Sequence, residues 1–132
     1  SHAERILQLV DQIEARSPQT VVEYQQKLQA RLEEMLADVK IDEQRILTEA
    51  AIFADKVAVA EETVRLRSHF DQMHQMLESG EPVGRKMDFL VQEMNREANT
   101  IGSKAVDSQI AYLVVDIKTE NEKIREQIQN IE

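Results

Sequence analysis

Backbone breakers are scarce in this chain, and that scarcity constrains its fold more than any other feature. The 132 residues include three glycines and two prolines, so few positions can end a helix. Apolar residues recur three and four positions apart, which is the spacing of one helical face, and strand signals are absent. The sequence therefore predicts an all-α fold, an elongated bundle of about five to six helices with a long amphipathic C-terminal helix.

Caps and breakers place the boundaries of the expected helices. Ser17 can cap a helix that Pro18 begins, because proline is tolerated in the first helical turn. Asp42 is a second candidate cap, and Gly80 and Pro82 are expected to end the helix that precedes them. The predicted spans are about residues 4–15, 18–39, 42–57, 59–79, 84–104 and 104–131.

Apolar stripes on these helices predict which side chains enter the core. On the third helix they are Ile46, Leu47, Ala50 and Ala51, and on the fourth they are Val59, Leu66, Phe70, Met73 and Leu77. Apolar residues recur along the last helix in near-heptad spacing, with an interruption at Glu120 and Asn121. They are Val106, Ile110, Leu113, Ile117, Ile124, Ile128 and Ile131. An amphipathic helix of this kind can pack along its own chain or against another subunit, and its spacing does not distinguish the two.

The helix expected at 84–104 has one apolar face and an unusually polar opposite face. Its apolar positions are Met87, Leu90, Val91, Met94, Ala98 and Ile101. The opposite face holds Arg85, Asp88, Gln92, Asn95, Arg96, Asn99 and Ser103. Guanidinium, carboxylate and carboxamide groups in consecutive turns offer more hydrogen-bonding capacity than helix stability requires. With Phe89 among them, these residues predict a surface that binds a partner.

Charge and composition exclude several classes of function. A formal net charge of -9 argues against nonspecific nucleic-acid binding, because phosphate affinity comes largely from clustered lysine and arginine. Any RNA contact is therefore expected to be local, at Arg85, Lys86, Arg96 and Lys104. The absence of cysteine excludes disulfides and thiolate metal sites and indicates a reducing cytoplasm. No apolar run approaches the roughly 20 residues that span a bilayer, so no membrane partner is expected.

His69 is the first candidate for catalysis. It borders the apolar stripe of its helix and shares one side with Arg65 and Glu62, four and seven residues earlier. An imidazole between a core and carboxylates can act as a general acid or base, or as a metal ligand. The alternative is a histidine that closes the edge of the core through one hydrogen bond. His74 is expected to be an ordinary surface residue.

Three segments carry a resemblance to a known family. The segment GRKMDFLVQEMNREANTIGSK (84–104) resembles the signature of the YicC/YloC-like proteins, which are bacterial endoribonucleases. VAEETVRLRSH (59–69) resembles that family's acidic segment before a histidine, and IREQIQNIE (124–132) resembles its terminal sequence. Family members are about twice as long. We therefore expect residues 1–3 to be a cloning remnant and residues 4–132 to form the helical C-terminal domain of a longer protein.

The resemblance implies a metal-dependent endoribonuclease that cleaves single-stranded or loop RNA and forms a homo-oligomer. It implies a divalent metal, manganese before magnesium, and RNA rather than DNA as the partner. The candidate catalytic residues are His69, Glu93 and Arg96. The candidate RNA-binding residues are Arg85, Lys86, Phe89, Gln92, Arg96, Asn99 and Lys104, and the candidate metal ligands are Glu61, Glu62, Asp88 and Glu97.

Each of these assignments has a structural alternative. Carboxylates four residues apart, such as Glu93 and Glu97, can share a cation but are also common on solvated helices. Arg96 can clamp a phosphate or bridge carboxylates between helices, and Phe89 can stack on a base or anchor a subunit contact. The alternative function is therefore a non-catalytic oligomerisation scaffold that supports an RNA-binding N-terminal half, with Phe89 and Ile117 at its contacts.

Overall fold

A computed structural model describes residues 1–37, 39–80 and 84–131, and those residues form five helices. They are α1 (His2–Met35), α2 (Glu43–Lys56), α3 (Ala60–Ser79), α4 (Gly84–Lys104) and α5 (Ser108–Ile131). The described residues contain no strand, so the prediction of an all-α fold is confirmed. Within the same ranges no helix combines the length and apolar content that a membrane span requires.

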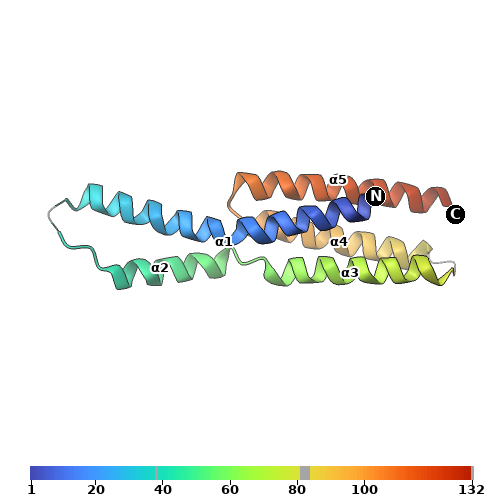
Figure 1. Cartoon of the computed structure of the whole chain (residues 1–132), viewed down its shortest axis with the longest axis horizontal. Coiled ribbons are helices and arrows are strands. Elements are labelled where there is room, and N and C mark those ends of the chain that lie inside the picture. Colours follow the sequence, from blue (N-terminus) through green and yellow to red (C-terminus); the bar gives the residue numbers. More distant parts are fainter. Residues whose placement is uncertain (38, 81–83, 132) are drawn as a thin grey trace.

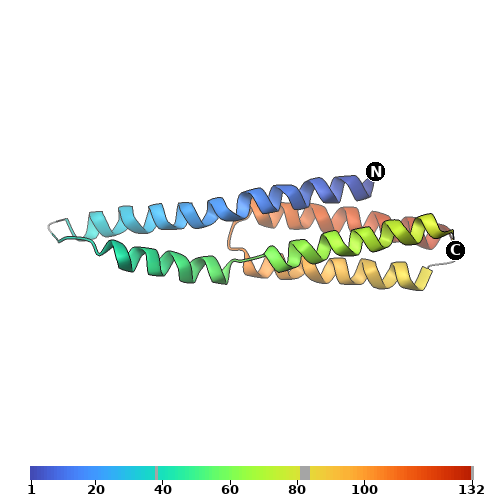
Figure 2. The same ribbon diagram turned by 60° about the horizontal axis from the view of Figure 1, so that its bottom comes forward.

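The molecule is elongated and has two parts (Figure 1). The first half of α1 packs with α3, α4 and α5 into a four-helix bundle, hereafter the bundle. The second half of α1, residues 18–35, runs on beyond the bundle and pairs with α2 as a two-helix arm, hereafter the arm. Figure 2 shows α2 and α3 one after the other alongside α1. Both chain termini lie toward the end opposite the tip of the arm.

The predicted break at Ser17 and Pro18 is wrong, because α1 continues through both residues. An internal proline costs a helix about 3 kcal/mol, since it lacks an N–H and crowds the preceding turn. Packing on both sides of the proline offsets this cost. Before it, the apolar side chains of α1 enter the core of the bundle, and after it Tyr24 stacks on Phe53 of α2 with ring centroids 4.0 Å apart.

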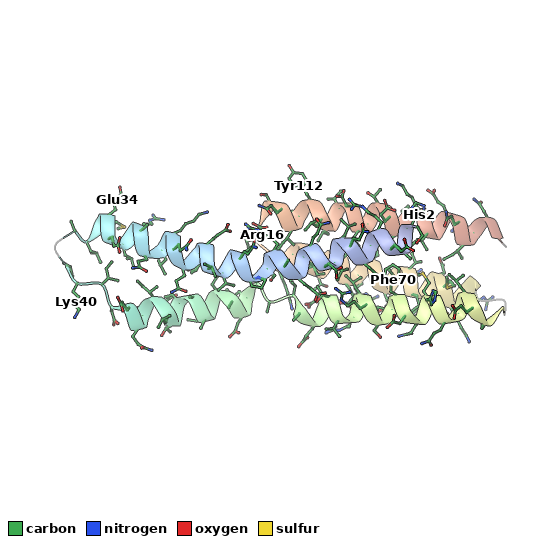
Figure 3. All side chains as sticks on the ribbon, viewed as in Figure 1. His2, Arg16, Glu34, Lys40, Phe70 and Tyr112 are labelled. Atoms are coloured by element: carbon green, nitrogen blue, oxygen red, sulfur yellow. The ribbon has the colours of Figure 1, made fainter. Side chains whose placement is uncertain are left out.

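Arg16 lies at the joint between the bundle and the arm (Figure 3). Its guanidinium donates to both carboxylate oxygens of Asp107, which lies between α4 and α5, at 2.9 and 3.2 Å. It also donates to both carboxylate oxygens of Glu23 on the arm, at 2.7 and 3.0 Å. Hydrogen bonds from Arg16 hold the pKa of both carboxyl groups below their ordinary values. The arm is therefore tied to the bundle by charge as well as by the continuous helix.

The apolar stripe of α3 enters the bundle core as predicted, through Val59, Leu66, Phe70 and Met73. Leu77 is exposed, because it lies in the last turn of α3. On α2, Ile46 and Ala50 are buried as predicted, whereas Leu47 and Ala51 are exposed because a pair of helices can bury only one face of each. Val106 is also exposed, since α4 ends at Lys104 and α5 begins at Ser108.

The C-terminal helix α5 packs along its own chain, against α1 and α4. Its buried positions follow a regular spacing of four and three residues: Ile110, Val114, Ile117, Asn121 and Ile124. The predicted interruption at Asn121 is therefore a heptad core position filled by a polar side chain. Asn121 Nδ2 donates to the backbone carbonyl of Val91 on α4 at 2.9 Å. A buried asparagine of this kind favours one register between packed helices.

Two predicted helix boundaries are confirmed. The Asp42 side chain accepts from the Arg45 backbone N–H at 3.3 Å at the start of α2. Gly80 ends α3 in the left-handed region with φ of 71°, a conformation that glycine adopts without strain. Pro82, the other residue expected to end this helix, lies outside the described residues.

Candidate metal centre

The seam between α3 and α4 collects charged side chains from both helices. On α3 these are Glu62, Arg65 and His69, which recur at three- and four-residue spacing and so share one side of the helix. On α4 they are Glu93, Glu97 and Lys104, which likewise share one side. The two helices pack against each other and run in opposite directions. The beginning of α3 therefore meets the end of α4, and pairs of opposite charge form across the seam.

His69, Glu93 and Glu97 converge in the middle of this seam, and we call them the triad. One ring nitrogen of His69 and one carboxylate oxygen from each glutamate lie within 4.8 Å of one another. Glu97 is buried, and the other two side chains are half-buried. His69 Nδ1 is buried and has no hydrogen-bond partner among the described residues. An imidazole that has one unpartnered buried nitrogen and lies close to two carboxylates is an arrangement that a cation would satisfy.

An arginine lies beside each carboxylate of the triad. Arg96 Nη1 lies 3.2 Å from Glu93 Oε1, and Arg65 Nη1 lies 3.7 Å from Glu97 Oε1. Arg65 also donates through Nη2 to Glu61 Oε2 at 3.0 Å. The hydrogen bond to Glu61, followed by the charge of Glu97, raises the pKa of Arg65 above its ordinary value. The Arg65 guanidinium therefore stays charged. The two arginines lie close enough to the glutamates to offset part of their negative charge.

Glu62 and Lys104 form the most buried ion pair of the seam. Lys104 Nζ donates to Glu62 Oε1 at 2.7 Å, and the Glu62 side chain is 4% exposed. Burial raises the pKa of Glu62, but the hydrogen bond from Lys104 and other favourable interactions outweigh it and leave the pKa below its ordinary value. The pair fixes the first turn of α3 against the last turn of α4. It thereby sets the register in which His69 meets Glu93 and Glu97.

The donor atoms of the triad suit a divalent cation. Such cations hold their ligands at about 2.0 to 2.6 Å, so two ligands of one ion lie at most about 5 Å apart. The spacing of 4.8 Å or less meets that condition. One imidazole nitrogen with two carboxylate oxygens is a set that manganese accepts readily, whereas magnesium prefers oxygen ligands and retained waters. The residues present therefore fit manganese better than magnesium.

The other predicted metal ligands lie outside the triad. Glu61 is largely exposed and pairs with Arg65 one turn along its own helix. Glu62 is held by Lys104. Asp88 is on a different side of α4, where its carboxylate lies 3.9 Å from Arg125 of α5. The glutamates that the sequence analysis paired, Glu93 and Glu97, are thus the ones that lie beside His69.

Most of the predicted RNA-binding residues lie on the exposed side of α4. Arg85, Lys86, Phe89, Gln92, Arg96 and Asn99 are all exposed. Phe89 precedes Glu93 by one turn, so its ring, which is 60% exposed, lies on a neighbouring position of the helix surface. Lys104 stands apart from this set, because it is bound to Glu62. The surface next to the triad therefore carries cationic, amide and aromatic groups.

One contact of the site has no signal in the sequence. The spacing places Arg65 one turn before His69, but only the packing of α3 on α4 shows that Arg65 also lies beside Glu97. A contact between helices depends on their relative rotation and register, and no single-helix pattern contains either. Helical periodicity alone predicts only that Arg65 lies one turn from His69, and it does not predict the contact between Arg65 and Glu97.

Comparisons with known proteins identify sequences that are similar to this chain. Residues 13–132 match the family described as "Endoribonuclease YicC-like, C-terminal". The chain is 52% identical over 124 residues to the "Probable endoribonuclease YicC" of Clostridioides difficile. This match covers 93% of the chain and 42% of that relative. It is 38% identical over 122 residues to the protein of the same name from Haemophilus influenzae, with 92% and 42% covered. The chain thus spans less than half the length of these relatives.

Proposed function

The chain belongs to the YicC-like C-terminal endoribonuclease family, and on that premise we propose that it carries the metal-binding centre of an enzyme that cleaves single-stranded or loop RNA. One observation supports the position of the centre above all others. His69 on α3 and the pair Glu93 and Glu97 on α4 meet within 4.8 Å, although 24 to 28 residues separate them in the sequence.

The proposal assigns each residue of the triad a defined task. His69, Glu93 and Glu97 hold one divalent cation, with manganese favoured by the mixed nitrogen and oxygen donors. When bound, such a cation polarises a phosphodiester and lowers the pKa of an attacking hydroxyl group. Because Glu97 is buried and its helix is packed on α3, the ligands stay in place without RNA. A preformed centre keeps the reorganisation cost of the reaction small.

Arg96 and Phe89 are proposed to hold the RNA next to the triad. Arg96 is 73% exposed and leaves its guanidinium free to reach a phosphate while it stays beside Glu93. Phe89 offers an exposed ring on which an unpaired base can stack. Stacking requires a base outside a duplex, which agrees with single-stranded or loop RNA as the substrate. The net charge of -9 is compatible with this role, because the contact is local.

The function is tested by a gel assay of the purified chain on a structured RNA with manganese, with and without EDTA. Cleavage in manganese that stops on addition of EDTA is expected, because the triad holds the cation that the reaction needs. Cleavage that continues in EDTA would contradict the metal centre. Intact RNA in manganese would contradict the placing of the cleavage centre in these helices and would favour the scaffold described below.

Phe89→Ala is expected to weaken binding of a single-stranded oligoribonucleotide about tenfold, which is the effect of losing one stacked base. Manganese binding should stay unchanged, since Phe89 is not in the triad. Fluorescence anisotropy with a labelled RNA measures the first quantity and calorimetry the second. The matched control is Tyr112→Ala, an exposed aromatic on α5 that points away from the bundle in Figure 3. Equal affinities for the two variants would rule out the stacking role.

A second function, assembly of subunits, is favoured by the arm. Of the twelve large apolar side chains that are exposed in the described residues, six lie on the arm or its tip. They are Val22, Met35, Leu36, Val39, Leu47 and Ile52. A groove of about 430 Å³ near the tip is lined by further apolar side chains of both helices, including Leu28, Leu32 and Ile46. We propose that a second copy of this chain covers the arm and forms a homo-oligomer.

Leu47→Asp is expected to lower the mass in solution toward that of one chain, because it places a charge in the proposed contact. Light scattering after size-exclusion chromatography measures that mass. Leu77→Asp is the matched control, since Leu77 is equally exposed but lies at the far end of α3. An unchanged mass for Leu47→Asp would place the contact elsewhere. Ile117 is unsuitable for this test, because it is fully buried in the bundle core.

A further inference from the structure

Arg65 differs from the other cations of the seam because it contacts two carboxylates that belong to different environments. One is Glu97, which is buried in the triad and lies 3.7 Å from Nη1. The other is Glu61, which is 79% exposed and accepts from Nη2 at 3.0 Å. Arg96 contacts a single carboxylate of the triad, Glu93, and Lys104 contacts none. These contacts cover the residues that the structure describes.

We propose that Arg65 sets the affinity of the triad for divalent cations by acting as the counter-ion of Glu97, and that Glu61 draws Arg65 away when the cation binds. The inference rests on the cation site of the proposed function. It adds a regulator of that site. Arg65 is a positioning residue in this account, because it acts on the cation through Glu97.

The charge of Arg65 opposes cation binding at the triad. Because Arg65 Nη1 lies 3.7 Å from Glu97 Oε1, a divalent cation held by Glu97 would be repelled by the guanidinium. A lysine or histidine could relieve this repulsion by losing its proton, but an arginine keeps its charge in proteins. A shift of Arg65 away from Glu97 therefore relieves the repulsion. Its side chain is 50% exposed, so nothing buried has to rearrange for that movement.

Glu61 already binds Arg65 and can keep it when the contact with Glu97 is lost. It lies four residues before Arg65 on α3, a spacing at which the two side chains meet on the helix surface. Because Glu61 is exposed, its carboxylate can keep the guanidinium as Glu97 turns to the cation. Glu61 thereby lowers the electrostatic cost of cation binding without touching the cation. A direct ligand role for Glu61 predicts a different result in the experiment below.

The test is a double-mutant cycle on manganese affinity, made of the wild-type chain, Arg65→Met, Glu61→Gln and the double variant. Each protein is treated with EDTA, dialysed, and titrated with manganese chloride in about 0.15 M salt, which screens long-range charge effects. Free manganese is read from its electron paramagnetic resonance signal, so the readout is independent of RNA cleavage. Both side chains are at least half exposed, so the substitutions leave the core intact.

Arg65→Met is expected to bind manganese about tenfold more tightly, because the repelling charge is gone. Glu61→Gln is expected to bind about threefold more weakly in the wild-type background and to have almost no effect in the Arg65→Met background. An unchanged or weaker affinity of Arg65→Met overturns the inference. An equal loss from Glu61→Gln in both backgrounds also overturns it, because Glu61 would then act on the cation itself.

The two proposals fail in distinguishable ways. If the wild-type chain and the Arg65→Met variant both bind no manganese, the cation site of the proposed function is wrong and the inference is wrong with it. If both bind manganese with equal affinity, the site stands and only the role of Arg65 is wrong. Glu97→Gln, which should abolish binding in either background, identifies the triad as the site that is titrated.

Discussion

Replacement of His69 by alanine is expected to lower the rate of manganese-dependent RNA cleavage by at least about 100-fold, the usual loss on removing a group that takes part in the chemistry. His69 supplies the nitrogen donor of the triad, and the remaining carboxylates hold a cation less well without it. The initial rate on a structured RNA at saturating manganese measures the effect. Glu93→Gln, which keeps the shape of the side chain but removes its charge, should cause a loss of similar size.

His74→Ala is the matched control, because His74 lies on the same helix but is 74% exposed and pairs with Glu78 rather than with the triad. It should cleave RNA at the wild-type rate. Circular dichroism and solution mass should be the same for all three variants, since none of the side chains is in the apolar core. Wild-type cleavage by His69→Ala would show that the triad is not the catalytic centre.

Lys104→Met is expected to destabilise the chain by about 2 to 3 kcal/mol. Removing one partner of a fully buried ion pair costs about 3 to 5 kcal/mol, and the partial exposure of Lys104 reduces that figure. The Glu62 carboxylate would lose the donor to Oε1, while its Oε2 already has no partner among the described residues. Urea denaturation followed by circular dichroism measures the free energy of unfolding. The midpoint of thermal unfolding should fall by about 10 °C.

The effect of Lys104→Met should depend on pH in a defined direction. The pKa of Glu62 in the folded chain lies below its ordinary value of 4.5, so its ion pair stabilises the fold above that pH. This contribution is lost as the pH falls from 4.5 through the folded pKa, because the carboxylate is then protonated. The stability difference between wild type and variant should therefore be largest near neutral pH and shrink in acid.

Lys86→Met controls for the loss of a lysine on the same helix. Lys86 is exposed and takes part in no ion pair among the residues that the structure describes. The Lys86→Met variant should therefore have the same free energy of unfolding as the wild-type chain at every pH. If Lys104→Met and Lys86→Met were equally stable at neutral pH, the pair between Glu62 and Lys104 would not fix α3 against α4.

Periodicity predicted the helices of the bundle well, because the side chains that define it face one continuous core. Leu66, Phe70 and Met73 recur on α3 and are all buried. Local rules failed where packing outweighed them. Pro18 marks a helix break by its own chemistry, yet α1 continues through it because contacts on both sides support the helix. Leu47 fits an apolar stripe but is exposed, since no third helix among the described residues covers the arm.

The sequence analysis offered His69 as one candidate and Glu93 with Glu97 as a possible pair, but it could not place the histidine beside the pair. The fold brings the donor atoms of all three together. The sequence could not separate them from Glu61 or Asp88, because all five occupy polar positions of amphipathic helices. What decides between them is the register of α3 on α4. That register depends on contacts such as the one between Glu62 and Lys104, which join residues 42 positions apart.

The central claim, that the triad holds a divalent cation, is tested most directly by a crystal of the chain soaked in manganese, with anomalous scattering recorded above and below the manganese absorption edge. The account predicts one anomalous peak bonded to His69, Glu93 and Glu97, which disappears in crystals of Glu97→Gln. A peak bound to Glu61 or Asp88, with the triad empty, would contradict it.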